Sequence, residues 1–282
     1  MKKGLIMEGG AMRGMFTAGV TDVMMENEIS FDGAVGVSAG AAFGCNYKSG
    51  QIGRAIRYNR KYCNDKRFAG MGSLIRTGNL FNTEFAYGEV PLKYDVFDFD
   101  TYEKNPMEFY VVCTDIETGR AVYHRYEGLN DHGFDWIRAS ASLPLVSQIV
   151  EIDGMKLMDG GMADSIPIRF FEEKGYDRNI VILTQPKDFV KKKNSMMPVI
   201  KVKYRKYPNL VETMENRHIV YNQTLSYIDE RERQGEVLVI RPEKSLNIGK
   251  VEKNPDKLQE VYEAGRKVAE RRIDEIREYL DK

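Results

Sequence analysis

A serine stands between two glycines early in the chain, directly after a short apolar run. The run from Gly33 to Val37 leads into Ser38, and small residues from Ala39 to Cys45 follow. This order fits a strand, a sharp turn and a helix, the context in which G-x-S-x-G forms a nucleophile elbow. Glycines at Gly36 and Gly40 leave room for such a turn. Because the pentapeptide also occurs by chance, a purely structural turn is an equal alternative on these residues alone.

A glycine-rich loop follows the first predicted strand, Lys3 to Met7, and precedes a helix predicted from about Met15 to Glu28. Its candidate anion-binding residues are Gly9, Gly10, Ala11, Arg13 and Gly14. Backbone N–H groups freed by glycines, together with the positive end of a helix, can bind a phosphate or a developing oxyanion. A dinucleotide-binding loop is the alternative, but its G-x-G-x-x-G pattern has alanine at the third position here.

The base that would activate Ser38 is less obvious, because serine nucleophiles are most often paired with histidine. The only histidine that follows Asp159 is His218, in a polar helical stretch typical of a surface or packing residue. Asp159 is the stronger candidate: it ends a predicted strand, and Gly160 and Gly161 allow close approach. An ordinary carboxylate, of pKa ~3.9, is a weak base, so burial would have to raise that value. Taken alone, an Asp-Gly turn is the simpler interpretation.

Together, the three motifs resemble the patatin-like phospholipase family, which combines a G-G-G-x-[RK]-G oxyanion loop, a G-x-S-x-G elbow and a D-G-[GA] motif. The resemblance covers about residues 3–185, including the stretch 138–144, and the last third resembles the extension of a bacterial, YjjU-like subgroup. It implies a Ser38–Asp159 dyad without histidine and an oxyanion bound by N–H groups around Gly10 and Ala11. It also implies hydrolysis of a fatty-acyl ester or phospholipid, with no metal or organic cofactor.

The chain departs from the family pattern at two positions. Ala11 replaces the third loop glycine, which keeps the N–H group but restricts φ. Ser165 stands where the family commonly has asparagine, so a supporting hydrogen bond is in question. Arg13 is expected to brace the loop or its charge. A lipid-binding or regulatory protein that keeps the fold with little catalysis is the alternative function.

Strands alternating with helices predict an α/β fold with a mostly parallel central sheet flanked by helices, the three-layer arrangement of the patatin-like family. Hairpins are expected at 107–126 and 148–158, and an irregular, apolar segment at 70–93 that packs on the body or covers an acyl pocket. One long helix is expected from Pro255 to Leu280. We expect a catalytic core at 1–185 and a helical extension at 186–282 packed on it.

Composition limits the classes of partner. The chain has 42 basic residues (Lys and Arg) and 42 acidic residues (Asp and Glu). With this balance no overall charge attracts nucleic acid, and any contact with a membrane must be local. The run from Lys191 to Lys193 is expected to be a solvated loop, with contact to phospholipid head groups as the alternative. Three separated cysteines and no transmembrane or signal segment lead us to expect a cytoplasmic protein. The oligomeric state is left open.

Overall fold

The computed structural model describes all 282 residues and contains one sheet of eight strands. The strands are β1 Lys2–Met7, β2 Gly33–Val37, β3 Glu108–Asp115, β4 Ala121–Arg125, β5 Val150–Ile152, β6 Met155–Asp159, β7 Tyr176–Ile182 and β8 Val237–Ile240. Their order across the sheet is β5-β6-β3-β2-β1-β7-β8, with β4 also paired to β3. The run from β3 to β8 through β2, β1 and β7 is parallel, while β4, β5 and β6 pair antiparallel. The predicted mostly parallel sheet and both predicted hairpins are confirmed.

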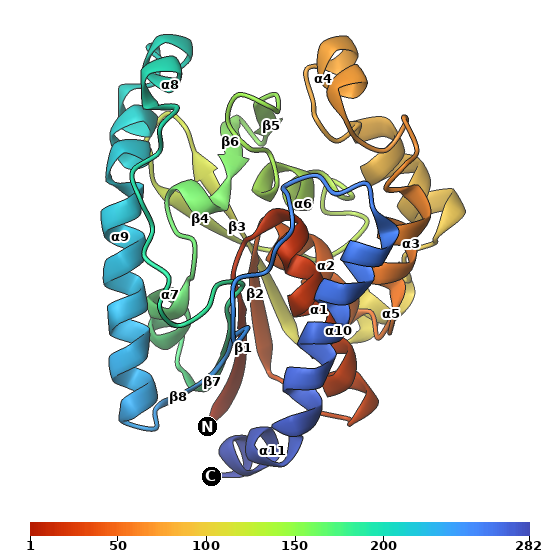
Figure 1. The fold of residues 1–282 in the computed structure, drawn as a ribbon, viewed down its shortest axis with the longest axis vertical. Coiled ribbons are helices and arrows are strands. Elements are labelled where there is room, and N and C mark those ends of the chain that lie inside the picture. Colours follow the sequence, from red (N-terminus) through yellow and green to blue (C-terminus); the bar gives the residue numbers. More distant parts are fainter.

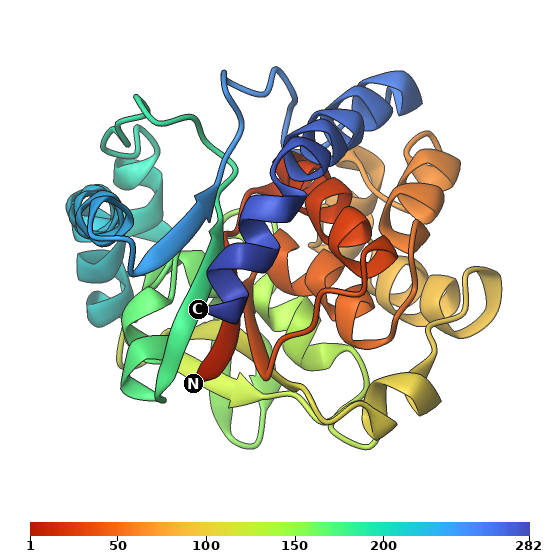
Figure 2. The ribbon, with the colours of Figure 1, turned by 90° about the horizontal axis from the view of Figure 1, so that it is seen from below.

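Helices cover both faces of this sheet (Figures 1 and 2). They are η1 Ala11–Arg13, α1 Gly14–Glu26, α2 Ala39–Lys48, α3 Arg54–Tyr62, α4 Met71–Thr77, η2 Glu84–Tyr94, α5 Phe99–Lys104, α6 Asp135–Ser140, η3 Gly160–Met162, α7 Ile168–Glu173, α8 Met197–Lys203, α9 Pro208–Arg233, α10 Pro255–Arg271 and α11 Ile273–Asp281. Alternate residues of each strand point to opposite faces. Leu5 and Met7 therefore join the core beneath α1, α2 and α10, while Ile6 joins a second core beneath α7 and α9.

Strand register brings the three motifs to one level at the same edge of the sheet. Val37 pairs with Val112 on β3, so the next residue, Ser38, lies level with Cys113. Cys113 pairs with Asp159 of β6, which lies on the same side of β3 as β2, because β4 occupies the opposite side at Val112 and Cys113. The serine and the aspartate are therefore neighbours along one edge of β3, where β6 takes over from β2. β1 ends beside β2 at Met7, which places the glycine-rich loop at this edge too.

The strand that ends at Asp159 is antiparallel, contrary to the expectation from the sequence. We expected a strand of a parallel sheet to end at this residue, but β6 runs antiparallel to β3. The hairpin of β5 and β6 projects beyond the carboxyl edge of the central strands, and β6 returns toward it (Figure 1). Asp159 thus reaches the level of Ser38 from outside the parallel part of the sheet.

Two expectations about local structure are wrong. The segment 70–93 is not irregular, because it contains α4 and the wide helical turns of η2, with Pro91 inside. Left-handed Gly78, with φ of 73°, ends α4 and separates it from η2. The C-terminal helix is two helices, since Arg272 leaves helical geometry and its guanidinium donates to the Val239 carbonyl at 2.6 Å. No glycine or proline marks that break.

The last third of the chain is joined to the rest through the sheet and through a close helix pair. β8 adds to the sheet beside β7. α10 packs on α1, where a Cβ atom on Gly265 would lie only 2.0 Å from the Phe16 carbonyl oxygen. No helix is both long and apolar enough to span a bilayer.

Candidate active site

Ser38 has the backbone geometry of a strained turn between β2 and α2. Its φ of 55° and ψ of −118° lie where residues with a side chain are rarely found. A Cβ atom on Gly36 would lie 2.5 Å from the Ala41 backbone, and one on Gly40 would lie 2.3 Å from the Met7 carbonyl oxygen. Close packing thus requires glycine at both positions. The side chain of Ser38 lies at the edge of an apolar cavity.

Ser140, at the end of α6, fastens this turn to the sheet. Its hydroxyl accepts the Ser38 N–H at 2.8 Å and donates to the Val112 carbonyl at 2.5 Å. Two residues later, the Ser142 carbonyl accepts the Asp159 N–H at 3.0 Å. The stretch 138–144 therefore positions the backbone of both candidate catalytic residues.

Asp159 is buried, with 2% of its surface exposed. Its Oδ1 accepts the Gly161 N–H at 2.8 Å, whereas Oδ2 has no hydrogen-bond partner. The Ser38 hydroxyl is near enough to favour the ionised form of the carboxyl, but the two groups do not have the geometry of a formed hydrogen bond. Catalytic hydrogen bonds are often long or poorly aligned before substrate binds.

Burial raises the pKa of Asp159 above its usual value, because a desolvated carboxylate is less stable than the neutral acid. Arg217 opposes this rise through its positive charge, with smaller contributions from the Ser38 hydroxyl and the Gly161 N–H. A raised pKa makes a carboxylate a better proton acceptor. This is the perturbation that a serine–aspartate pair needs.

The turn after Asp159 is stabilised from several sides. The Thr114 hydroxyl donates to the Asp159 carbonyl at 2.8 Å. The Gly161 carbonyl accepts from the Ser165 hydroxyl at 2.7 Å and from the Arg217 guanidinium. Ser165 thus supplies a hydrogen bond to this turn although the family commonly has asparagine there. A Cβ atom on Gly160 would lie 2.0 Å from the Val112 carbonyl oxygen, so only glycine fits.

The glycine-rich loop lies against the elbow. A Cβ atom on Gly9 would lie 3.1 Å from the Ser38 Cβ, and one on Gly10 would lie 2.7 Å from the Thr184 hydroxyl. Ala11 adopts φ of 48°, a left-handed conformation that costs alanine energy and suits the glycine found there in the family pattern. Gly14 begins α1, with Ala39 and Phe43 of α2 against it.

The loop is anchored by a buried glutamate that the sequence analysis did not single out. Glu8 accepts the Thr184 N–H at 2.6 Å, the Thr184 hydroxyl at 3.0 Å and the Tyr221 hydroxyl. Its place between an apolar strand and two glycines was the only sequence signal. Arg13, expected to brace the loop, makes no side-chain hydrogen bond, and its Nε is buried without a partner.

None of the three histidines is hydrogen-bonded to Ser38. His124 stacks on Trp136 and contacts Asp131 at 2.6 Å. His132 lies 3.1 Å from Asp153. His218, on α9, lines a basic hollow with Arg217. The site therefore offers a carboxylate, and no imidazole, as the base.

Beside Ser38 lies an apolar cavity of about 80 Å³. Its walls come from η1, α2, α3, η2 and the loop after α6. They include Met12, Phe43, Tyr58, Phe68, Phe81, Tyr87 and Leu143. Part of the 70–93 segment thus lines this cavity.

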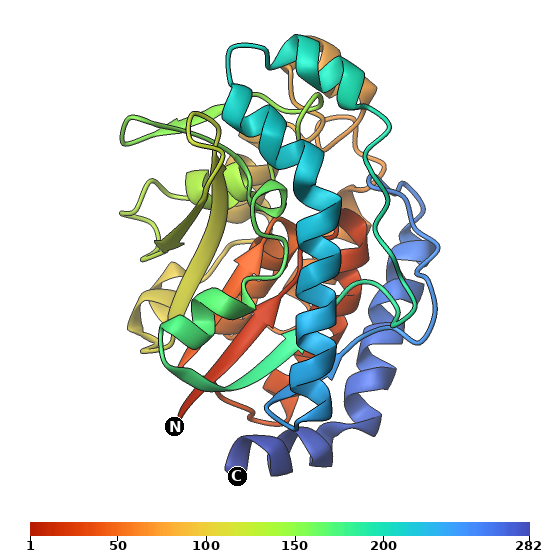
Figure 3. The same cartoon turned by 90° about the vertical axis from the view of Figure 1, so that its left-hand side faces the viewer.

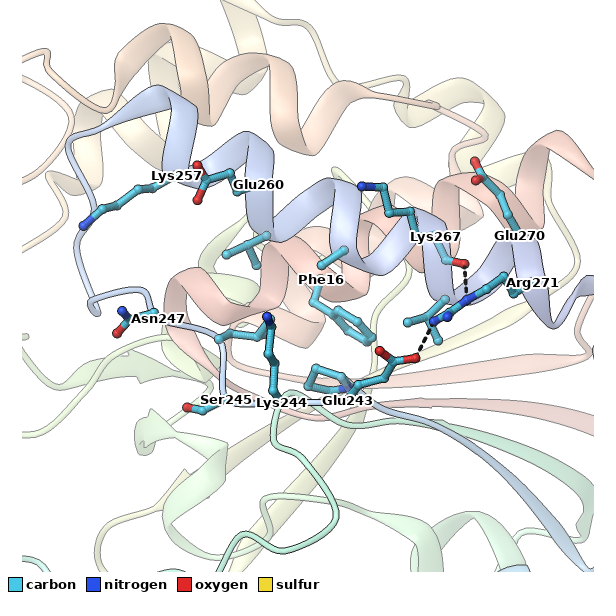
Figure 4. Close-up of a pocket in the computed structure, with 15 residues that line it drawn as sticks. Phe16, Glu243, Lys244, Ser245, Asn247, Lys257, Glu260, Lys267, Glu270 and Arg271 are labelled. Carbon is cyan, nitrogen blue, oxygen red and sulfur yellow. Dashed lines mark hydrogen bonds and ion pairs between the residues drawn. The ribbon is translucent and has the colours of Figure 1, made fainter.

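A larger, open groove of about 650 Å³ lies elsewhere, between α10 and residues 242–247 (Figure 4). Its walls carry both charges, and Arg271 pairs with Glu243 at 2.7 Å. Neither Ser38 nor Asp159 lines it. Ser38 therefore borders the small apolar cavity, although the groove is larger.

Two family models match the chain. A patatin-like phospholipase model matches residues 5–171. A model of a domain of unknown function, DUF6363, matches residues 207–281.

Similar proteins agree with the first match. The uncharacterized protein YjjU of Escherichia coli K12 is 31% identical over 194 residues, 64% of this chain and 52% of YjjU. Lysophospholipase nte1 of Emericella nidulans is 30% identical over 186 residues, 62% of this chain and 11% of that protein. The chain thus spans about half the length of YjjU and about a tenth of the lysophospholipase. The crystal structure of VipD from Legionella pneumophila shares the fold at a TM-score of 0.50 and 12% identity, over 97% of this chain and 67% of VipD.

Proposed function

The chain belongs to the patatin-like phospholipase family, and from this we propose that it is a serine acyl hydrolase acting on lipid esters through a Ser38–Asp159 dyad. The observation that most supports the proposal is the pairing of a strained, glycine-flanked serine with a buried aspartate whose Oδ2 is unpartnered. Strain at one residue and an unsatisfied buried oxygen at another both cost stability, and both gather where a protein does chemistry.

In the proposed reaction, Asp159 Oδ2 accepts the proton of the Ser38 hydroxyl as Oγ attacks the acyl carbonyl carbon. The protonated carboxyl then gives that proton to the leaving alkoxide, and an acyl-serine remains. Water, deprotonated by the same carboxylate, attacks the acyl-serine and releases the fatty acid. The proton finally returns to Ser38, so the dyad ends as it began.

The developing oxyanion would be stabilised by backbone N–H groups of the glycine-rich loop around Gly10 and Ala11. The N-terminus of α2, immediately after Ser38, adds a favourable dipole. Losing one such donor typically lowers turnover by ~10²–10³-fold. Gly9 and Gly14 serve this arrangement by letting the loop approach the elbow and α2.

The cavity beside Ser38 is suited to the acyl group, because its walls are almost wholly apolar. An apolar cavity of ~150 Å³ holds one benzene molecule, so about 80 Å³ admits only the first few carbons of a chain. Short esters should therefore react without rearrangement. Longer chains require movement of the walls, and a lipid substrate requires at least a transient contact with a lipid surface.

The test is hydrolysis of a short p-nitrophenyl ester, with labelling of Ser38 by a fluorophosphonate. We expect Ser38→Ala to abolish both and Asp159→Asn to lower turnover by ~10²–10⁴-fold, the range for a lost general base. His218→Ala is the matched control and should change little, as should EDTA. Full turnover in either dyad variant would refute the mechanism. Saturable lipid binding without a Ser38 adduct would instead support a lipid-binding protein of the same fold.

A further inference from the structure

Two short helices, α4 and α8, project at the same end of the molecule (Figures 1 and 3). They come from distant parts of the chain, and one lies on each side of the hairpin of β5 and β6 (Figure 1). β1 and β2 run toward this end, so it is also the end at which Ser38 lies. The feature that distinguishes these helices is the kind of side chain they expose.

Both helices expose large aliphatic side chains. Ile75 on α4 is 82% exposed and Val202 on α8 is 72% exposed. Three further exposed apolar residues belong to the same helices or their first turns: Met71, Met196 and Val199. A single exposed aliphatic residue is ordinary, but a group of five at one end of a protein indicates a surface that something covers.

The chain around α8 is also strongly basic, in contrast to the balanced chain as a whole. No Asp or Glu occurs between Asp188 and Glu212, whereas this stretch contains Lys191, Lys192, Lys193, Lys201, Lys203, Arg205 and Lys206. Lys201 pairs with Glu215, but Lys203, Arg205 and Lys206 make no ion pair, and neither does Arg76 on α4. We call the five apolar residues and these four free cations the α4–α8 face.

The run from Lys191 to Lys193, predicted as a solvated loop with lipid contact as the alternative, is not the centre of this face. The Lys191 backbone is held to Asn222 on α9, and its ammonium lies 4.1 Å from the centre of the Tyr221 ring. Only Lys192 and Lys193 are exposed.

The loop after Ser142 connects the two helices to the cavity beside Ser38. Gln148 donates to the Thr77 carbonyl at the end of α4 at 2.9 Å. The Leu145 N–H donates to the Tyr204 hydroxyl, directly after α8, at 3.2 Å. Leu143 of the same loop lines the cavity. A surface covering the α4–α8 face would thus lie over the loop that borders the acyl cavity.

We propose that the α4–α8 face docks on an anionic lipid bilayer, with the aliphatic side chains entering the interface and the free cations contacting phosphate-bearing head groups. The inference deepens the proposed function, on which it rests, by naming the surface that supplies the substrate. The combination of projecting apolar side chains with unpaired Lys and Arg matches the apolar interior and negative surface of such a bilayer.

Vesicle co-sedimentation tests the proposal. We use the Ser38→Ala protein, so that hydrolysis does not alter the lipid, with vesicles of phosphatidylcholine alone or with phosphatidylglycerol added. Tight binding to the anionic vesicles that weakens with salt is expected. Each lost basic residue should weaken binding about fivefold at low salt. A Lys203→Gln/Arg205→Gln/Lys206→Gln variant should therefore bind at least tenfold more weakly.

An Ile75→Ser/Val202→Ser variant tests the apolar part and should also bind at least tenfold more weakly. Matched controls on other elements are Ile219→Ser on α9 and Lys267→Gln on α10, both exposed, which should bind within twofold of the parent. Circular dichroism verifies that each variant is folded.

The proposal is overturned if the parent does not prefer anionic vesicles, or if the controls weaken binding as much as the α4–α8 variants do. Binding of an acidic protein without binding of vesicles would overturn it as well. Ester hydrolysis by the wild-type protein without vesicle binding refutes only this inference. Vesicle binding without any ester hydrolysis refutes only the proposed function.

Discussion

Ser140→Ala is the substitution that examines most directly whether the tertiary structure, and not the elbow sequence alone, prepares Ser38. The residue is fully buried, and its hydroxyl is the group that accepts the Ser38 N–H and donates to the Val112 carbonyl. Alanine has almost the same shape and removes only the oxygen. The variant therefore separates hydrogen bonding from packing.

The expected magnitude follows from two comparable energies. Leaving the buried Ser38 N–H without a partner costs about 1–3 kcal/mol. The conformation at φ of 55° and ψ of −118° stores a similar ~1–3 kcal/mol of strain, which only the surroundings maintain. Without the Ser140 hydroxyl, the turn can relax and carry the Ser38 Oγ away from Asp159. A penalty of ~1.4–2.8 kcal/mol in the transition state lowers kcat/KM by about 10- to 100-fold.

The assay is kcat/KM on a short p-nitrophenyl ester, together with the rate of Ser38 labelling by a fluorophosphonate. Ser142→Ala is the matched control, because its hydroxyl donates only to the Arg138 carbonyl, and the backbone carbonyl that accepts the Asp159 N–H remains. It should keep nearly full activity. If Ser140→Ala retains wild-type kcat/KM and labelling, or loses no more than Ser142→Ala, then the elbow does not depend on this contact and the reasoning fails.

Two further predictions concern stability. Burial raises the pKa of Asp22 to about 6 from 3.8. The unfolded chain therefore loses this proton at lower pH than the folded protein. The free energy of unfolding falls by about 3 kcal/mol as the pH rises from 3.8 to about 6. Asn at this position can still accept hydrogen bonds from Gly53 and Tyr262, so Asp22→Asn should raise the melting temperature at pH 8 and leave it unchanged at pH 4. An equal rise in melting temperature at both pH values would contradict the raised pKa of Asp22. Gly265→Ala should destabilise by ~1–3 kcal/mol because its methyl group would meet the Phe16 carbonyl, whereas Gly72→Ala, in an open helical position, should stabilise by ~0.5–1 kcal/mol. Thermal unfolding measures both, and a stable Gly265→Ala protein would show that α1 and α10 can separate freely.

Local sequence was sufficient for the elements whose patterns are unambiguous. The short apolar runs became β1 and β2, and the Asp153–Gly154 turn became the hairpin of β5 and β6. The elbow glycines are explained by close approach of other backbone atoms, which a Cβ atom at either position would prevent. By contrast, the segment 70–93 has no clean apolar period, because some of its apolar residues, such as Phe85 and Val90, are buried and others, such as Ile75, are exposed. Therefore α4 and η2 could not be recognised.

For the candidate site, the sequence by itself determined which residue types were present and their order: a glycine-rich loop, a glycine-flanked serine and an Asp-Gly-Gly turn. The tertiary structure decided their relation. Pairing of β3 first with β2 and then, along the same edge, with β6 brings Ser38 and Asp159, 121 positions apart, to one level. Only the fold brings Ser140 and Arg217 to these motifs and joins Glu8, which precedes the loop glycines, to Thr184 and Tyr221, because each contact links residues far apart in the chain. Local patterns reflect local backbone preferences, whereas burial, electrostatic shifts of pKa and hydrogen bonds between distant segments exist only once the chain has packed.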